Sequence, residues 1–484
     1  MDPKVDRTAL HSGIVHLGIG AFMRAHLAVA TEAAIEASGD ARWGISGVSL
    51  RSPDTRDALV PQGCRYTLAI RDADEQGRPR QRLQQIGCVR EVLVAPEDPR
   101  AVLERIAHED TRIVSLTVTE KGYCHDPATG RLRLDHPDIA HDLQHADAPK
   151  SAIGFIVRGL ALRRERGLSP ITLTSLDNLP SNGHTLQAAV LAFARETDAE
   201  LAAWIEANCT FPCSMVDRIV PRTTDEDRAS IEQALGHHDA WPVVAEPFFD
   251  WAVEDRFAAG RPDWTKGGAR FVDDAAPWER LKLRMVNGAH STIAYLGAVA
   301  GWRTVDEAIA QPAMRQFIEA LMREEIEPTL PALPGLDLAA YRAQLLQRFA
   351  NPALAHRLHQ IAMDGSQKLP QRLLGTVRDR LAAGAPITRL ALGIAGWLNY
   401  LRGVDERGEA YAIDDPLAQA LSQTLRAADG SGDDEHRAHI LSSFTAVFGD
   451  LAGDPRLARA LAPHLRSLRE SGVTTTAHAL AWRV

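Results

Sequence analysis

The start of the chain places a strand, a tight glycine turn and a helix in direct succession, and this feature restricts the fold most. Residues 14–17 (Ile-Val-His-Leu) predict a buried strand, Gly18-Ile19-Gly20 a turn, and the segment from Ala21 to about Ser38 a helix. Amides at such a helix N-terminus can hold a pyrophosphate, so the order predicts a doubly wound α/β domain that binds a dinucleotide. Met23 occupies the position of the usual third glycine, so a purely structural turn is an alternative.

A carboxylate follows the second predicted strand. The apolar run from Ile45 to Leu50 is followed by Asp54, where dinucleotide-binding folds use an acidic side chain to bind the ribose hydroxyls. Such a group repels the 2′-phosphate of NADP, so we expect NAD as the cofactor, with NADP less favoured. The nearby Arg51 is the feature that could admit NADP. In the alternative interpretation, Asp54 only caps the short helix that follows.

Polar residues also follow two later strands. The β-branched run 113–119 leads to Glu120, and the run 171–176 precedes Asn178. Doubly wound sheets bind ligands at the carboxyl ends of their strands. We therefore expect Thr119 and Glu120 beside the cofactor, and Asn178 at the same edge of the sheet. By local rules alone, Asn178 would be a turn residue.

Beyond Trp278 the pattern becomes helical almost without interruption. We therefore predict a Rossmann-type NAD-binding domain with extra strands over residues 1–277. A mainly α-helical domain is predicted over residues 278–484. At 484 residues, the chain is long enough for two or three domains.

The first predicted helix of the second domain carries four polar side chains on one face. At about 100° per residue, Lys282, Asn287 and His290 lie within an arc of about 140°, and Glu279 joins them from the preceding turn. Leu283 and Val286 share this arc. A face that is half apolar suits the lining of a ligand site better than bulk water, although an ordinary solvated helix face is the alternative.

Composition excludes several classes of protein. The net charge of −9 provides no basic surface for nucleic acid or an anionic membrane. The first seven residues lack an apolar signal core, and the longest apolar run, near Leu390 to Leu398, is too short to span a bilayer. We expect a cytoplasmic protein. The five cysteines are scattered and form no zinc-site pattern, so no metal is expected. The oligomeric state is not fixed by the sequence, which is compatible with a monomer.

Six stretches, in order over nearly the whole chain, resemble the polyol-specific long-chain dehydrogenases, the family of mannitol 2-dehydrogenase and fructuronate reductase. The last stretch is the most diagnostic. They are Gly18-x-Gly20-Ala21-Phe22-x-Arg24-Ala25-His26, Thr117-Val118-Thr119-Glu120-Lys121-Gly122-Tyr123, Asp177-Asn178, Met215-Val216-Asp217-Arg218-Ile219, Gly260-Arg261-Pro262 and Lys282-x4-Asn287-x2-His290.

The resemblance implies a Rossmann domain with a helical domain, NAD(P) as cofactor, and catalysis without a metal. It implies that Lys282 is the general base and that Asn178 and Asn287 hold the reacting oxygen. His290 would position the substrate, and Glu279 would control proton exchange with water. The cofactor would contact the glycine turn and its continuation, namely Gly18, Ile19, Gly20, Ala21, Phe22 and Arg24.

These roles agree with the chemistry of alcohol oxidation. The reaction needs a base for the hydroxyl proton and donors for the developing alkoxide. A lysine can act as a base near neutral pH only if its surroundings lower its pKa from about 10.4. Two other classes remain open: a metal-dependent hydrolase or lyase using the same histidine and glutamate, and a nucleotide-binding scaffold without catalysis, which would have no need of the polar set.

The segment 360–372 bears on the substrate. Mannitol-preferring relatives typically carry an arginine in place of Gln360, whereas this segment is similar to that of the fructuronate reductases. The preferred pair would be D-mannonate and D-fructuronate, because Lys368 or Arg372 could pair with the carboxylate of a hexuronate. Alternatively, these cations are surface or interdomain charges and the substrate is a neutral polyol such as mannitol or D-arabinitol, or a phosphorylated polyol.

Overall fold

The computed structural model describes residues 9–73, 78–126, 130–333 and 335–481. The first seven residues, for which the sequence predicts no signal core, lie outside these ranges. The chain divides into two compact units. One comprises Met1–Asp72 with Arg80–Glu279, and the other comprises Ala73–Pro79 with Arg280–Val484. The predicted domain limit at residue 277 stays a prediction.

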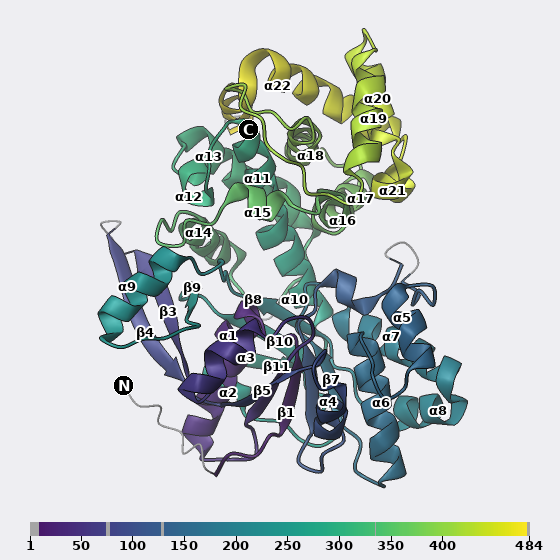
Figure 1. Ribbon diagram of the computed structural model, residues 1–484. Helices are drawn as coiled ribbons and strands as arrows, with labels where there is room; N and C mark the ends of the chain where they lie inside the picture. The colour runs from purple at the N-terminus through teal and green to yellow at the C-terminus, as the bar shows by residue number, and fades with distance from the viewer. Residues whose placement is uncertain (1–8, 74–77, 127–129, 334, 482–484) are drawn as a thin grey trace. The chain divides into compact units, whose positions relative to one another are not determined.

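A five-stranded parallel sheet forms the centre of the N-terminal unit (Figure 1). Its strand order is β5-β2-β1-β6-β7, with β1 pairing in parallel with both β2 and β6. This is the order in which dinucleotide-binding folds arrange their first five strands, with the chain reversing direction beside β1. The strands are β1 (Ile14–Leu17), β2 (Ile45–Ser49), β5 (Val89–Val94), β6 (Ile113–Leu116) and β7 (Thr172–Ser175).

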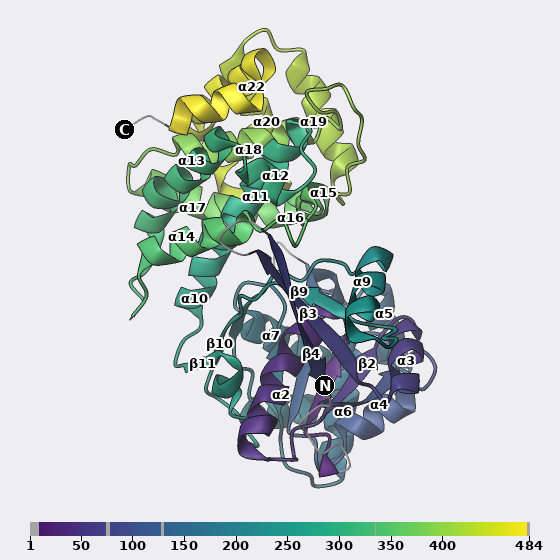
Figure 2. The same ribbon diagram turned by 90° about the vertical axis from the view of Figure 1, so that its left-hand side faces the viewer.

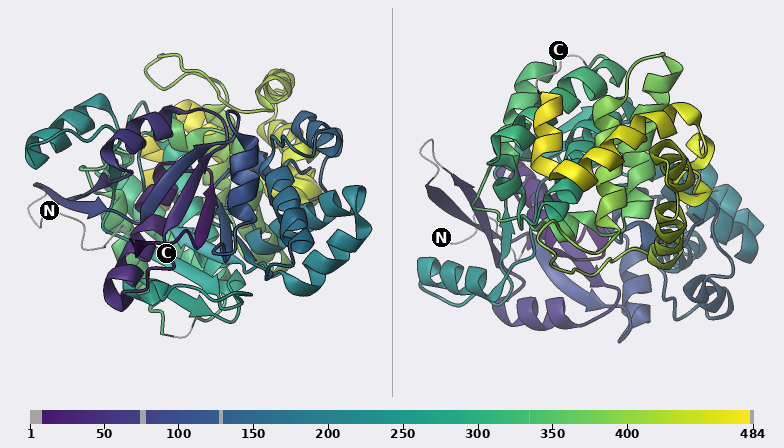
Figure 3. Two further views of the ribbon diagram at one scale, coloured as in Figure 1. Left: turned by 60° about the horizontal axis from the view of Figure 1, so that its bottom comes forward. Right: turned by 90° about the horizontal axis from the view of Figure 1, so that it is seen from above.

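Helices cover this sheet on both faces, as expected for buried parallel strands. One core cluster joins Val15 and Leu17 of β1 to residues of α4, α6, α7 and α8. The other joins Ile14 to residues of α2, and Figure 3 (left) shows the purple strands between helices. The helices of this unit are α1 (Ala21–Ala25), α2 (Leu27–Ser38), α3 (Asp54–Leu59), α4 (Pro99–Ile106), α5 (Pro137–Gln144), α6 (Ala152–Glu165), α7 (Asn182–Thr197), α8 (Ala199–Asn208) and α9 (Asp225–Leu235).

Two small three-stranded sheets supply the extra strands that the sequence predicts. One has the order β11-β10-β8 and the other the order β4-β3-β9. Their strands are β3 (Tyr66–Ala73), β4 (Pro79–Ile86), β8 (Ser214–Asp217), β9 (Val243–Ala245), β10 (Asp250–Glu254) and β11 (Ala269–Val272). Short 3-10 turns are η2 (Val60–Gln62), η3 (Glu120–Tyr123) and η4 (Trp264–Gly267).

The C-terminal unit is built around α11 (Ala289–Val299), every residue of which is buried. Figure 2 shows α11 among α12, α13 and α18, and Figure 3 (right) shows the yellow α22, which bends at Gly472. The helices that follow α10 (Ala276–Leu281) and α11 are α12 (Val305–Ile309), α13 (Pro312–Ala320), α14 (Leu338–Phe349), α15 (Leu358–Ala362), α16 (Gly365–Leu369), α17 (Gly375–Ala382), α18 (Thr388–Tyr400), α19 (Ala418–Asp429), α20 (Asp434–Ser442), α21 (Thr445–Phe448) and α22 (Pro455–Ala481). Two 3-10 turns, η7 (Glu327–Thr329) and η9 (Gly449–Leu451), complete the set.

Within the described part of this unit, three segments are π-helical: η5 (Lys282–Gly288), η6 (Leu321–Ile326) and η8 (Pro370–Leu374). The sequence prediction of an ordinary α-helix over residues 282–290 is therefore wrong up to Gly288. Regular α-helix begins only at Ala289. The predicted helix from Ala21 to Ser38 is also interrupted, at His26 between α1 and α2.

No helix within the described ranges is both long and apolar enough to cross a membrane. The apolar run near Leu390 to Leu398 forms most of α18, which is buried inside the helical unit.

Candidate functional site

The turn after β1 has a conformation that requires glycine. Gly18 has φ +93°, and a Cβ atom there would lie 2.2 Å from the carbonyl oxygen of Thr117. The Thr117 hydroxyl donates to the Gly18 carbonyl at 2.8 Å. Ile19 is buried and lies directly over Gly47 of β2, where a Cβ would meet its Cδ1 atom at 2.3 Å. The turn is thus fixed against the strands on both sides of β1.

The backbone after this turn suits a pyrophosphate. Gly20 is exposed, and no side chain of the described residues caps the N-terminus of α1. The amides of its first turn, including those of Ala21 and Phe22, therefore need partners from solvent or a ligand. A Cβ on Gly20 would meet only the Gly18 carbonyl oxygen, at 3.8 Å. A dinucleotide fits this open turn.

Met23 and Arg24 point into the core instead. Met23 is fully buried, so the missing third glycine is replaced by a packing residue. The Arg24 guanidinium donates to the carbonyl of Trp241 and lies 5.2 Å from the centre of the Tyr66 ring. Burial lowers the pKa of Arg24 to about 10. These contacts brace α1 against neighbouring segments.

A buried histidine, His16, holds the strand that leads into the glycine turn. Imidazole nitrogens of His16 lie 2.8 Å from the Ser115 hydroxyl and 2.9 Å from the Thr117 hydroxyl, so the ring links β1 to β6. Burial lowers the pKa of His16 to about 3, and the ring is neutral at physiological pH. A histidine inside an apolar run is the only sequence signal for this contact.

Asp54 lies at the first position of α3, after the end of β2. It is exposed, and its Oδ2 atom accepts a hydrogen bond from the Ser52 hydroxyl at 3.0 Å. The N-cap residue of α3 is Pro53, and no side chain caps that helix. Asp54 is therefore not an N-cap residue, and both Asp54 and Arg51 are exposed.

The ends of β6 and β7 are joined through a buried carboxylate. The oxygens of Asp177 accept hydrogen bonds from the amides of Val118 and Thr119 at 3.0 and 2.9 Å, and from the Tyr123 hydroxyl at 2.9 Å. Thr119 and Asn178 are exposed on this edge. The glycine turn, Thr119, Glu120 and Asn178 thus lie at the carboxyl ends of neighbouring strands, as predicted.

Glu279 belongs to the N-terminal unit, on α10. Its Oε2 atom accepts a hydrogen bond from the amide of Ser181 at 2.8 Å. Ser181 precedes α7 and follows Asn178 by three residues. This contact fixes the start of α10 beside the Asn178 turn.

The π-helix η5 places the most diagnostic motif in an unusual register. Its residues are joined five apart instead of four, so Lys282 and Asn287 come to the same side. On an α-helix they would differ by about 140°. Lys282 and Asn287 are 5% and 7% exposed, and the buried Nδ2 atom of Asn287 has no hydrogen-bond partner in the described structure. π-Turns are frequent at functional sites because they change the direction of side chains.

His290 follows on α11 and is buried between two rings. Its imidazole stacks on Phe349 at 5.2 Å between centroids and meets the edge of His356 at 5.1 Å. Burial is the main reason that the pKa of His290 is far below its ordinary value, and His356, Arg372, Arg348 and Lys282 lower it further. The Nε2 atom of His290 is buried and has no hydrogen-bond partner among the described residues. A neutral imidazole with an unpaired nitrogen is suited to bind a hydroxyl group.

The segment predicted to recognise the substrate lies in the same unit. Arg372, on η8, donates from Nη1 to the Ser291 hydroxyl at 3.0 Å. Lys368, on α16, donates from Nζ to the Ile361 carbonyl at 3.2 Å. Both side chains are half-buried, whereas Gln360 is exposed on α15. Burial lowers the pKa of His356 to about 4, and the charge of Lys368 contributes to this decrease.

An aspartate outside the predicted set anchors this segment. The carboxylate of Asp415 accepts hydrogen bonds from the amide and hydroxyl of Ser366, at 2.7 and 2.6 Å. The π-helices η5 and η8 also pack tightly together, because a Cβ on Gly288 would lie 2.8 Å from the Arg372 carbonyl oxygen. The helical unit therefore brings together Lys282, Asn287, His290 and Arg372.

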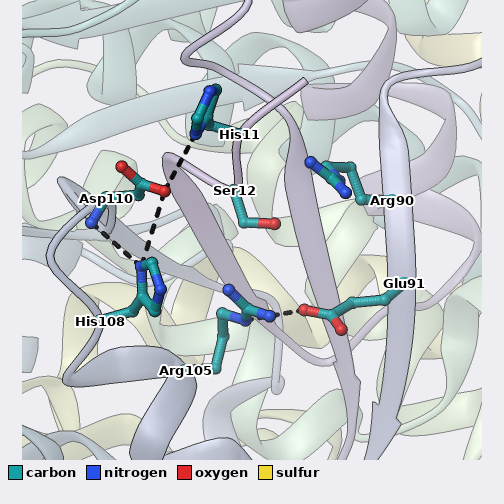
Figure 4. A pocket seen from close by; sticks show the side chains of 7 residues that line it. All are labelled: His11, Ser12, Arg90, Glu91, Arg105, His108 and Asp110. Atoms are coloured by element: carbon teal, nitrogen blue, oxygen red, sulfur yellow. Dashed lines mark hydrogen bonds and ion pairs between the residues drawn. The ribbon is translucent and has the colours of Figure 1, made fainter. Parts of the chain in front are cut away.

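A polar pocket of about 220 Å³ lies at the amino-terminal edge of the parallel sheet (Figure 4). An ion pair joins Arg105 to Glu91 at 2.7 Å, and His11 Nδ1 lies at hydrogen-bond distance from Asp110 Oδ2, 3.1 Å. Dinucleotides bind at the opposite, carboxyl edge. The pocket contains none of the predicted site residues, and its lining is His11, Ser12, Arg90, Glu91, Arg105, His108 and Asp110.

Among the residues that the structure describes, no group of three or more His, Cys, Asp or Glu side chains could hold a metal ion. Catalysis without a metal stays a prediction.

Both halves of the chain match models of one protein family. Residues 12–266 match the mannitol dehydrogenase Rossmann domain, and residues 274–469 match the mannitol dehydrogenase C-terminal domain. The chain belongs to the mannitol dehydrogenase family. It is an oxidoreductase of that family, and the predicted combination of a Rossmann-type domain with a helical domain is confirmed.

Several relatives within the mannitol dehydrogenase family are similar over almost the full chain. D-mannonate oxidoreductase of Escherichia coli (strain K12) is 47% identical over 455 residues, which are 93% of this chain and 91% of the relative. Mannitol 2-dehydrogenase of Phaeosphaeria nodorum is 39% identical over 480 residues, 98% of this chain and 82% of the relative. The structure of Pseudomonas fluorescens mannitol 2-dehydrogenase in ternary complex with NAD and D-mannitol matches with a TM-score of 0.90 at 38% identity, covering 100% of this chain and 96% of that one.

Proposed function

We propose that this protein transfers hydride between NAD and a secondary alcohol or ketone of a linear sugar derivative, without a metal. The observation that carries the proposal is the family match over both halves of the chain, with the intact motif Lys282-x4-Asn287-x2-His290. When bound, NAD supplies the hydride acceptor and NADH the donor. Residues 278–484 are proposed as the substrate-binding and catalytic domain.

The residues have distinct proposed roles. Lys282 removes the hydroxyl proton during oxidation and returns it during reduction. Asn178 and Asn287 donate to the reacting oxygen, and amides suit this role because they do not titrate. The unpaired Nδ2 atom of Asn287 supports this assignment. His290 positions the substrate, and Glu279 controls the exchange of the proton with water.

The cofactor is proposed to bind along the turn from Gly18 to Phe22, with Arg24 bracing it, and beside Thr119 and Glu120. The exposed carboxylate of Asp54 would accept the ribose hydroxyls and disfavour NADP. The solved relative that contains NAD supports the choice of cofactor.

For the substrate we propose the pair D-mannonate and D-fructuronate. Two observations support an acidic sugar. The Escherichia coli D-mannonate oxidoreductase is 47% identical, and the guanidinium groups of Arg372 and Arg348 lie near enough to His290 to lower its pKa. Positive charge around the substrate-positioning residue favours a carboxylate, and Arg372 can bind one through two parallel hydrogen bonds. Gln360 and Lys368 complete the proposed substrate set.

A neutral polyol is the second candidate. It is favoured by the relatives named mannitol 2-dehydrogenase, among them the structure solved with D-mannitol. In that case the physiological pair would be mannitol, or D-arabinitol, and its ketose.

The deciding experiment compares D-fructuronate with D-fructose as substrates for NADH oxidation, followed by absorbance. We expect far higher kcat/KM for D-fructuronate. Arg372→Ala and Lys368→Ala should each lower kcat/KM for D-fructuronate and not for D-fructose. The loss should correspond to about 2 kcal/mol, or about 30-fold, if the cation and the substrate carboxylate form a desolvated pair. Arg378→Ala is the matched control, because Arg378 forms an exposed ion pair with Asp450 on the surface of α17. Higher efficiency with D-fructose or D-mannitol than with D-fructuronate or D-mannonate would establish the neutral-polyol activity instead.

A further inference from the structure

The loop after β6 contains a residue in a conformation that is unfavourable for its type. Thr119 has φ +61° and ψ 171°. This region is populated almost only by glycine, and a β-branched side chain there is a genuine outlier. Such strain costs on the order of tenfold or more in the population of the conformation, so other contacts must hold it.

The carboxylate of Asp177 makes the contacts that hold Thr119. It accepts hydrogen bonds from the amides of Val118 and Thr119, so both peptide groups on the N-terminal side of the strained bond point at one charged group. The Tyr123 hydroxyl, at the end of the same loop, donates to Asp177 and lies within hydrogen-bond distance of Ser175. Hydrogen bonds to an ionised acceptor are about twice as strong as those between neutral groups.

The rest of Asp177 is fixed independently of its carboxylate. Its amide donates to the Ser175 hydroxyl at 3.1 Å, and its carbonyl accepts from the Asn182 side chain at 3.1 Å and from the Leu179 amide at 2.9 Å. Asn182 is fully buried and also bonds the carbonyl of Ser214 at 2.8 Å. The backbone next to Asn178 is therefore rigid, and the side chain of Asp177 acts on the loop 117–123.

We propose that Asp177 is a positioning residue for cofactor binding: its buried carboxylate holds the strained Thr119 and the loop 117–123 in the conformation that receives NAD. This inference rests on the proposed function. Asp177 is only 9% exposed, so its ionised carboxylate is largely desolvated, which is unfavourable. Burial raises its pKa to about 6, and the bonds from Val118, Tyr123 and Thr119 act against that rise, while Glu120 adds to it. The carboxylate is ionised at pH 8.

The test measures the dissociation constant of NADH at pH 8 by quenching of protein fluorescence, together with the thermal unfolding midpoint. Asp177→Asn should weaken NADH binding by about 10- to 100-fold, since the strain is no longer held. Thr119→Gly removes the strain, because glycine adopts this conformation freely. The effect of Asp177→Asn should therefore shrink to about threefold or less when Thr119→Gly is also present. Tyr123→Phe should weaken binding in the same direction by a smaller factor.

Glu32→Gln provides the matched control. Glu32 is also a buried carboxylate that accepts hydrogen bonds from two successive amides, those of Gly87 and Cys88, at 2.8 and 2.6 Å. These amides directly precede β5, at the amino-terminal ends of the strands and away from the proposed cofactor site. This variant should lower the unfolding midpoint and leave NADH affinity unchanged.

Three outcomes overturn the inference: wild-type NADH affinity in Asp177→Asn, an equal loss of affinity with and without Thr119→Gly, or an equal loss in Glu32→Gln. If Asp177→Asn does not fold, Tyr123→Phe with and without Thr119→Gly supplies the same comparison. A wild-type protein that binds no NADH contradicts the proposed function itself, which is a different result.

Discussion

Replacing Gly288 by alanine tests whether the two π-helices set the geometry of the catalytic residues. The added Cβ would lie 2.8 Å from the carbonyl oxygen of Arg372, whereas an ordinary contact is 3.4 Å or more, so the helices must separate by about 0.6 Å. The obstacle is a backbone atom, which cannot turn away as a side chain does. Overpacking of this kind costs about 1–3 kcal/mol of stability.

The catalytic effect should exceed the effect on stability. Asn287 directly precedes Gly288, and Arg372 carries the opposing carbonyl, so the movement separates the proposed oxygen donor from the proposed carboxylate ligand. A misplacement approaching 1 Å lowers rates by up to about 100-fold. We expect kcat/KM for D-fructuronate to fall by about 10- to 100-fold, while the dissociation constant of NADH stays unchanged.

The assay follows NADH absorbance at saturating NADH, with NADH binding and thermal unfolding measured on the same samples. Gly375→Ala is the matched control, because its Cβ would meet only Arg284 and Pro370 atoms at 3.8 and 3.9 Å. A Gly288→Ala enzyme with kcat/KM within twofold of the wild type would show that the contact between η5 and η8 does not set the catalytic geometry. So would an equal loss in both variants.

Three further predictions concern the base, the cofactor and the response to acid. Lys282→Ala should lower kcat by orders of magnitude while NADH still binds, and near-normal turnover of this variant would show that Lys282 is not the base. Exhaustive chelation should leave the wild type active, and activity that is lost on chelation and restored by zinc would contradict catalysis without a metal. The kcat/KM with NAD should be at least about tenfold higher than with NADP, and Asp54→Ala should reduce this ratio. Equal kcat/KM values with the two cofactors in the wild type would contradict the proposal that Asp54 binds the ribose hydroxyls. The pKa of His16 is lowered to about 3 in the folded protein, so between about pH 6.5 and 3 the unfolded chain binds a proton that the folded chain does not. The free energy of unfolding should therefore fall as the pH falls through this range, by up to about 1.4 kcal/mol per pH unit from His16 alone. In denaturant unfolding at pH 7, 6 and 5, the free energy of unfolding of His16→Asn should fall less steeply with decreasing pH than that of the wild type. An equal dependence on pH in both proteins would contradict the neutral, buried state of His16.

The arrangement of the N-terminal unit could be predicted because its signals are local. The apolar run before Gly18, the glycine turn and the β-branched run before Thr119 each encode one element. Parallel strands then bring their carboxyl ends to one edge of the sheet without further information. The placement of Thr119, Glu120 and Asn178 on that edge followed from this rule.

The contacts that hold the edge together could not be predicted in the same way. His16 bonds residues 99 and 101 positions away, and Asp177 bonds amides 58 and 59 positions away. Such pairs have no periodicity in the sequence, and Asp177 would read only as a turn residue. The burial of Arg24 was hidden for the same reason, since its partner Trp241 is 217 residues distant.

The geometry of the helical motif could not be predicted from the α-helical period. At 100° per residue, Lys282 and Asn287 differ by about 140° and share their face with Leu283 and Val286. The structure instead closes the turns five residues apart over Lys282–Gly288. Helix propensity does not distinguish an α-helix from a π-helix. The close contact of η5 with η8 joins segments far apart in the sequence, so no local pattern reveals it.

The π-helix also couples the number of residues in this segment to the way its turns close. If the turns of Lys282–Gly288 closed four residues apart with no residue removed, everything that follows would rotate by about 100°. All eleven residues of α11 are buried, so the rotation could not be absorbed by a solvent-facing side. Removing one residue together with the wider closure would leave α11 facing nearly the same way. We therefore expect that lineages of this fold with one residue fewer between the lysine and the asparagine form an ordinary α-helix here, and that lineages with the same number keep the wider turn.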